Sequence, residues 1–143
     1  MVSDESFHQE LEQIQNVIDR QASNSFKIKG WTVTLVVVAL LFRTNNFQLF
    51  AAFIPLIGFW FLDAYYLKQE RRFRELYNWV RQNRPDNEDH LFDMDPSRVD
   101  GDVDGTARLM LNNSLLWFYG TVGILLILYS AILTFINGGT IFG

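Results

Sequence analysis

The sequence predicts an all-α membrane protein with three transmembrane helices, cytoplasmic helical extensions and assembly into a homo-oligomer. Of the 143 residues, 49% are hydrophobic and 15% are aromatic. The apolar residues gather in three runs, two of which are close to the ~20 residues that cross a bilayer. Amphipathic helical patterns precede the first run and follow the second.

The first element is an amphipathic cytoplasmic helix over residues 1–29. A Ser6/Gln9 pair is the capping box expected at its start. Its apolar residues recur with 4-3-4 spacing among polar neighbours, which is typical of one helical stripe: Phe7, Leu11, Ile14 and Ile18.

The first transmembrane helix is expected over residues 30–43. Only 13 uncharged residues separate Lys29 from Arg43, a length that also suits a buried helix of a soluble protein. The side chains of Lys27 and Lys29 can extend to the membrane surface, which lengthens the span. We therefore interpret this segment as membrane-spanning.

The second transmembrane helix is expected over residues 44–84, where it continues into the cytoplasm. A charge-free span of 19 residues ends at Leu62, and Pro85 is the first strong helix stop after it. Beyond the span, one apolar stripe continues: Tyr66, Phe73, Leu76 and Val80. This stripe is expected to pack on that of residues 1–29, or on copies from other subunits. Pro55 and Gly58 allow a bend in the membrane.

An acidic cytoplasmic loop is predicted over residues 85–108, with one short helix after Asp95. The loop contains "DGDVDG", which resembles the start of a calcium-binding loop. Its ninth and twelfth positions, however, are Arg108 and Leu111, where the twelfth should be a bidentate Glu. An acidic turn and a cation site remain the two alternatives.

The third transmembrane helix is expected over residues 109–137, followed by an external tail at 138–143. No charged residue occurs from Leu109 to the last residue of the sequence. Small and polar residues share one face, which either packs within a subunit or lines a narrow wet path between subunits. The candidate pore or packing residues are Gly120, Gly123, Ser130, Thr134 and Asn137.

The basic residues predict the orientation. Arg43 is the single basic residue on one side of the first two spans, whereas six flank the other side: Lys27, Lys29, Lys68, Arg71, Arg72 and Arg74. Because positive loops stay inside, the N-terminus is expected in the cytoplasm and the C-terminus outside.

The sequence contains no recognisable catalytic set, so we expect a protein that is not an enzyme and needs no cofactor or metal. Asp63, at the inner boundary near Lys29, is a candidate for coupling the cytoplasmic helices to the membrane, with simple pairing or hydration as the alternative. Five arginines are candidate contacts for lipid headgroups or a phosphate ligand: Arg71, Arg72, Arg74, Arg81 and Arg84.

Three stretches carry a resemblance to a known group: "NSFKIKGWTVTLVVVALLF" (24–42), "FWFLDAYYLKQERRFRELYNWVR" (59–81) and "FDMDP" (92–96). They resemble small three-span bacterial inner-membrane proteins found in anti-phage operons. The chain is similar in size and layout to the membrane effector of the Hailong defence system. The resemblance implies an ion channel whose signal is a nucleotide or oligonucleotide made by a companion nucleotidyltransferase.

Two functions are therefore expected as alternatives. The first is a homo-oligomeric inner-membrane effector, an ion channel that depolarises the membrane in anti-phage defence. The second is a non-conducting anchor or regulator that docks a soluble partner through its cytoplasmic helices. The lipid bilayer and further copies of the chain are the expected partners in the first case.

Overall fold

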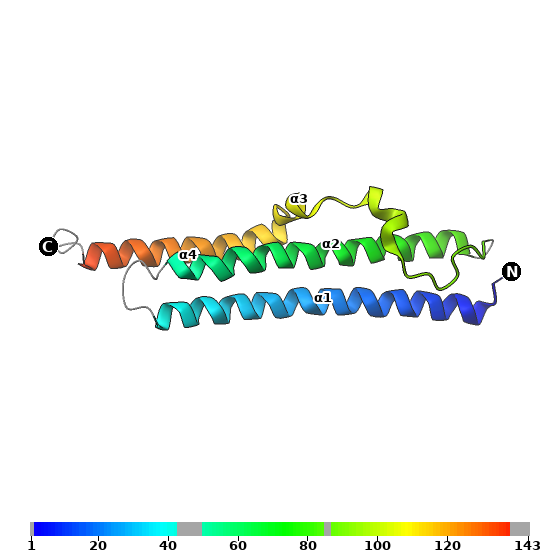
Figure 1. Cartoon of the computed structure of the whole chain (residues 1–143), viewed down its shortest axis with the longest axis horizontal. Coiled ribbons are helices and arrows are strands. Elements are labelled where there is room, and N and C mark those ends of the chain that lie inside the picture. Colours follow the sequence, from blue (N-terminus) through cyan, green and yellow to red (C-terminus); the bar gives the residue numbers. More distant parts are fainter. Residues whose placement is uncertain (1, 43–49, 85–86, 138–143) are drawn as a thin grey trace.

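Three long helices aligned along one axis make up most of this computed structural model (Figure 1). The structure describes residues 2–42, 50–84 and 87–137, and these form no β-strand. The three helices are α1 (Asp4–Leu41), α2 (Phe53–Asn83) and α4 (Asn113–Asn137). Each is long and apolar enough to cross a membrane. The prediction of an all-α chain with three potential membrane spans is therefore confirmed.

Helix α1 joins the predicted amphipathic helix and the first span without a break. Its 38 residues correspond to about 57 Å at 1.5 Å per residue. The Ser3 side chain caps it by accepting a hydrogen bond from the Ser6 backbone N–H at 3.2 Å. The predicted Ser6/Gln9 capping box is therefore wrong, because the helix begins at Asp4, where acidic residues of the first turn suit the helix dipole.

Helix α2 is continuous from the apolar half of the molecule into the charged half, as predicted for the second transmembrane helix and its cytoplasmic extension. Pro55 is its third residue, a first-turn position whose missing N–H would have no helical partner. Pro55 therefore does not interrupt the helix in its middle, where a proline would cause the predicted bend. A short 3₁₀ turn at residues 50–52 precedes α2, and the predicted beginning of this span, residues 44–49, lies outside the described residues.

The two amphipathic stripes pack on each other within one chain. We call the charged half of the α1–α2 hairpin the stalk. Its buried apolar core, the stalk seam, consists of Ile14, Ile18, Leu76, Val80 and Val99. Of the two predicted alternatives, the one present in the subunit is therefore packing of the α2 stripe on the stripe of residues 1–29. The connection between α2 and α4 adds Val99 to the stalk seam.

This connection runs back along α2 and contains two short helices, η3 (Pro96–Asp102) and α3 (Thr106–Met110). The helix predicted after Asp95 is present as the 3₁₀ helix η3. The predicted start of the third span at residue 109 is wrong, because Leu109 is buried in α3 and the chain turns before α4 begins. At that turn the Asn112 side chain accepts a hydrogen bond from the Ser114 backbone N–H at 3.1 Å, which favours a new helix start.

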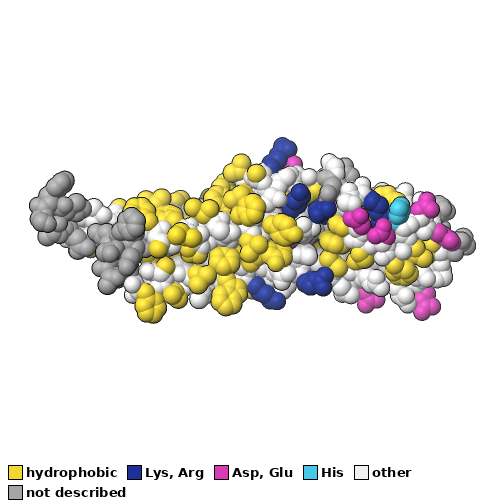
Figure 2. Space-filling view, viewed as in Figure 1, with side chains coloured by type: hydrophobic (Ala, Val, Ile, Leu, Met, Phe, Trp, Pro, Cys, Tyr) yellow, Lys and Arg dark blue, Asp and Glu magenta, His cyan; other side chains and the backbone are white. Residues whose placement is uncertain are grey.

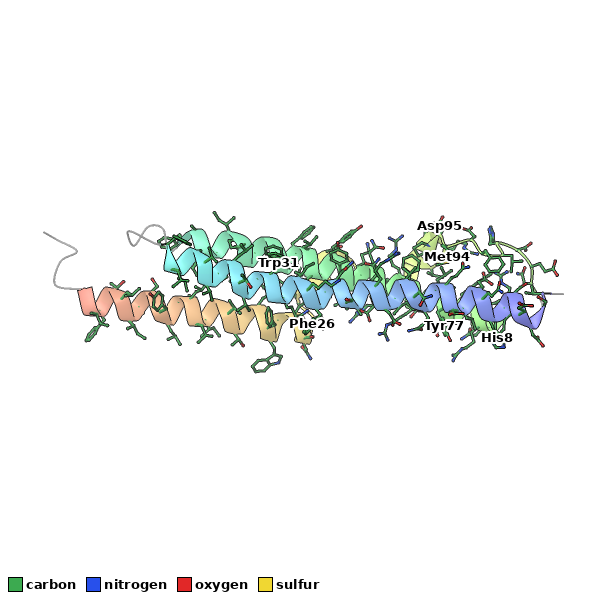
Figure 3. All side chains as sticks on the ribbon, turned by 90° about the horizontal axis from the view of Figure 1, so that it is seen from below. His8, Phe26, Trp31, Tyr77, Met94 and Asp95 are labelled. Carbon is green, nitrogen blue, oxygen red and sulfur yellow. The ribbon has the colours of Figure 1, made fainter. Side chains whose placement is uncertain are left out.

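The surface divides into an apolar half and a charged half (Figure 2). Large apolar side chains are exposed over the first half, including Trp31 (60%), Trp117 (77%) and Ile124 (59%), and Figure 3 shows Trp31 projecting from α1. Exposed apolar surface of this extent is typical of side chains that contact lipid. The arrangement is consistent with a membrane location.

Candidate functional site

A buried carboxylate joins the three long helices where the apolar half meets the stalk. Asp63 on α2 has no exposed surface. Its carboxylate lies 2.5 Å from the Lys29 ammonium and accepts a hydrogen bond from the Ser25 hydroxyl, both on α1. It also accepts a hydrogen bond from the Tyr119 hydroxyl of α4 at 3.0 Å. We call these four residues the Asp63 cluster.

Local packing places each donor of the cluster. Ser25 and Lys29 lie four residues apart and therefore share one face of α1. The Tyr119 ring stacks on Trp60 of α2, with ring centroids 5.9 Å apart and planes within 10°. The Trp60 indole N–H donates to the Met110 carbonyl at 3.0 Å, which attaches the end of α3 to α2. These contacts fix α4 against the hairpin.

The charge of Asp63 is compensated within the chain. A buried ionised carboxylate is costly unless it is paired and hydrogen-bonded, and Asp63 has three donors. Lys29 retains 22% exposure, so its ammonium lies between the buried carboxylate and the surface. The predicted proximity of Asp63 and Lys29 is present in the structure. The role of Asp63 and Lys29 in coupling the stalk to the membrane remains a prediction. A functional role is the default hypothesis for an ionisable group at such a position.

The predicted small and polar face of α4 is not the face that packs against α2. The buried residues of α4 are Leu115, Tyr119 and Leu126. Of the predicted face, Gly123 touches α2, since a Cβ there would lie 3.7 Å from Leu56 Cδ2, whereas one at Gly120 would meet no atom within 4 Å.

The remaining predicted residues lie further along α4. Thr134 is exposed, and its hydroxyl donates to the Ser130 carbonyl at 3.0 Å. Ser130 is partly buried. Asn137 ends α4, and its side chain lies outside the described structure. Packing within one subunit therefore accounts for Gly123 but not for Gly120 or Thr134.

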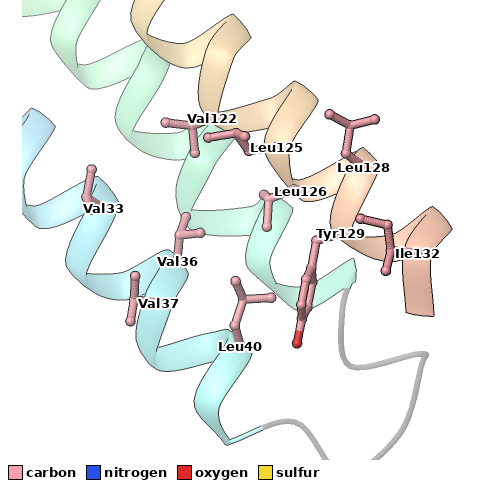
Figure 4. A pocket seen from close by; sticks show the side chains of 10 residues that line it. All are labelled: Val33, Val36, Val37, Leu40, Val122, Leu125, Leu126, Leu128, Tyr129 and Ile132. Carbon is pink, nitrogen blue, oxygen red and sulfur yellow. The ribbon is translucent and has the colours of Figure 1, made fainter. Parts of the chain in front are cut away.

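An apolar groove of about 600 Å³ separates α1 from α4 in the apolar half (Figure 4). It forms because both helices pack mainly on α2. The lining is aliphatic apart from Tyr129, and includes Val33, Val37, Leu125 and Ile132. A groove with this lining suits an acyl chain or another helix, and its lining side chains offer an ion no charged ligand.

Four of the five predicted headgroup arginines have partners within the chain. Arg71 lies 4.0 Å from the Asp104 carboxylate, and Arg74 pairs with Glu70 at 2.6 Å. Arg72 donates to the Gln69 side chain at 3.2 Å. Arg81 is exposed and remains a candidate. The prediction that Arg84 contacts a headgroup or phosphate is wrong, because its side chain is fully buried and paired with Glu10 at 2.6 Å.

Sequence reasoning missed Ser25 and Tyr119 of the Asp63 cluster, and it also missed the buried Glu10. Glu10 lies three residues after Phe7 and four before Ile14, on the apolar stripe of α1, where a charged side chain needs a partner. Its position on the apolar stripe could have indicated a buried, paired carboxylate. It could not identify the partner, Arg84, which is 74 residues away.

The calcium alternative stays a prediction. Asp104, the third acid of "DGDVDG", bonds to Arg108 at 3.1 Å, and the side chains of Asp100 and Asp102 lie outside the described structure. Among the residues that are described, no group of three or more His, Asp or Glu could hold a metal ion.

The comparisons with known proteins add no assignment. No protein-family model matches the chain. No curated protein and no solved structure matches it either.

Proposed function

We propose that the chain is one subunit of a homo-oligomeric bacterial inner-membrane effector that conducts ions and depolarises the cell in anti-phage defence. The observation that carries this proposal is the Asp63 cluster. It is a buried ion pair where the three apolar helices meet the stalk, and intramembrane or membrane-edge ionisable groups commonly mark ion paths and gates. The resemblance to a defence effector supports the same function.

Conduction requires several copies of the chain. Apart from Tyr129, the groove between α1 and α4 is lined by aliphatic side chains, so this groove within a single subunit does not offer a wet path. Gly120 and Thr134 face away from α2, which leaves them available to neighbouring subunits. Small residues permit close approach of helices, and hydroxyl groups can line a narrow path between them.

The stalk is proposed to lie in the cytoplasm, where it receives the signal. Basic side chains gather where the apolar half ends (Figure 2), as expected for a cytoplasmic membrane surface. The proposed signal is a nucleotide or oligonucleotide from a companion nucleotidyltransferase, for which Arg81 is the exposed candidate contact. Because α1 and α2 are continuous, movement of the stalk would reach the Asp63 cluster directly.

The second candidate function is a non-conducting anchor that docks a soluble partner. The observation that favours it is the length of the stalk: in α1, 26 residues precede the apolar segment at Gly30, about 39 Å of helix. Such a surface serves partner binding without any pore.

Membrane potential during expression distinguishes the two functions. The channel is expected to depolarise cells that carry the companion signalling genes once the system is triggered, as read by a potential-sensitive dye. Tyr119→Phe should alter this response, whereas Tyr65→Phe, at an exposed tyrosine of the same region, should not. A detergent-purified particle of monomer size, or an unchanged potential with the protein correctly inserted, would reject the channel and favour the anchor.

A further inference from the structure

The end of the stalk furthest from the apolar half contains a second buried ion pair, which lies outside the proposed ion path. The Arg84 guanidinium donates to the Glu10 carboxylate through Nε at 2.7 Å and Nη2 at 2.6 Å. Glu10 is 1% exposed and Arg84 is fully buried. A two-point arginine–carboxylate contact of this kind is strong and geometrically specific.

The remaining guanidinium hydrogens bind the connection. Nη1 donates to the carbonyls of Asn87 and Asp89 at 3.0 and 2.7 Å, and Nη2 donates to the carbonyl of His90 at 3.2 Å. All five N–H groups of Arg84 are thus used. The Phe92 backbone N–H donates in turn to the Glu10 carboxylate at 3.2 Å. One ion pair therefore holds α1, the end of α2 and the start of the connection together.

The backbone held by this pair is strained. His90 and Phe92 have φ angles of 60° and 58°, in the left-handed region that residues other than glycine rarely occupy. Such conformations persist where surrounding contacts enforce them. Here the carbonyl of His90 and the N–H of Phe92 are among the groups bound by Arg84 and Glu10.

Beyond Phe92 the connection lies over the stalk. Val99 belongs to the stalk seam and Met94 packs against it, and Figure 3 shows Met94 and Asp95 beside the stalk. The Arg98 guanidinium carbon lies 4.9 Å from the centre of the Trp79 ring. The Asp95 side chain caps η3 by accepting a hydrogen bond from the Ser97 backbone N–H at 2.9 Å. The hydrogen bonds from Ser97 lower the pKa of the Asp95 carboxyl.

We propose that residues 87–102 are a releasable strap, which the Glu10–Arg84 pair holds over the stalk seam. Loss of this pair alone frees the strap, because its strained turns then lose the groups that enforce them. The α1–α2 hairpin stays folded, since Ile14, Ile18, Leu76 and Val80 continue to pack on each other. Release uncovers the seam and loosens the segment that leads into α4. The proposal does not depend on whether the protein conducts ions.

Hydrogen–deuterium exchange of the full chain in lipid nanodiscs tests the strap. Glu10→Gln and Arg84→Lys each retain much of the side-chain volume and remove the two-point charged contact. Both should speed exchange of the amides of residues 91–99 by roughly tenfold or more. Exchange in α1 and α2 at the level of Ile18 and Leu76 should change far less. Glu12→Gln and Arg20→Lys, at exposed positions of the stalk, are the matched controls and should leave the exchange unchanged.

Two results would overturn the proposal. Unchanged exchange of residues 91–99 in both variants would mean that the ion pair does not hold the strap. Equal acceleration throughout the stalk would mean that the connection is an inseparable part of the stalk fold. Faster exchange confined to the strap supports it.

Discussion

The hydroxyl of Tyr119 lies 3.0 Å from a carboxylate oxygen of Asp63, so a polar contact joins α4 to the α1–α2 hairpin at the edge of the apolar half. The same oxygen lies 2.5 Å from the Lys29 ammonium. These three residues therefore connect α4, α2 and α1 through one carboxylate oxygen.

Tyr119→Phe tests the α4 contact directly. It removes the hydroxyl and keeps the ring that stacks on Trp60, while Asp63 keeps its bonds to Lys29 and Ser25. Hydrogen bonds to charged groups contribute about 1.5–3 kcal/mol, and we expect a loss near the lower end of this range. Reversible unfolding in detergent measures it, with Tyr65→Phe as control. Equal stability of the two variants would show that the contact does not hold α4.

Lys29→Met is expected to destabilise the protein more than Asp63→Asn. Removing Lys29 leaves a fully buried carboxylate with two neutral donors, and breaking a buried pair in this way costs about 3–5 kcal/mol. Removing the charge of Asp63 leaves a lysine that is 22% exposed and can extend into water. Unfolding measurements on both variants and on the double variant give the order. The reverse order would contradict the burial of Asp63.

The two glycines of the predicted packing face should respond differently. Gly123→Leu places a side chain against Leu56 and should destabilise the single subunit by about 1–3 kcal/mol. Gly120→Leu meets open space and should leave subunit stability within about 0.5 kcal/mol. If neighbouring subunits cover this face, Gly120→Leu should instead reduce the size of the detergent-solubilised particle. Equal subunit stability and equal particle size of the two variants would contradict the different surroundings of Gly120 and Gly123.

Reporter fusions test the orientation. The six basic residues on one side of the first two spans, against Arg43 on the other, predict the N-terminus inside and the C-terminus outside. A periplasm-active reporter placed after residue 143 should be active, and the same reporter placed before residue 1 should be silent. The opposite result would place the stalk outside the cell and exclude a cytoplasmic signal.

The helices were predictable from local pattern, whereas their contacts depended on residues far apart in sequence. The apolar runs and the absence of helix breakers between Phe59 and Arg84 predicted α2, because lipid contact and helix periodicity act over neighbouring residues. The break before α4 was missed because Leu109 continues the charge-free run, so hydropathy could not reveal the turn that Asn112 caps.

The candidate site was predictable in part for the same reason. Asp63 stood out as a charge at the end of an apolar run, and the short link between two helices placed Lys29 near it. The Tyr119 contact required the lateral position of α4, which no periodicity specifies. In sequence, Arg84 could not be distinguished from its neighbour Arg81. Arg84 is buried because it binds the Glu10 carboxylate and backbone carbonyls within residues 87–90, and these contacts are not visible in the sequence.

Ion flux from liposomes containing the purified, correctly inserted protein tests the central claim most directly, with any required activator supplied or inhibitor removed. The account predicts flux from the wild-type oligomer and its loss in the Ser130→Leu/Thr134→Leu variant, because a path without hydroxyl groups becomes dry. A control variant, Leu128→Ile/Ile132→Leu, alters the groove side of α4 and should conduct normally. Absence of flux from an activated wild-type oligomer would contradict the channel and leave the anchor in its place.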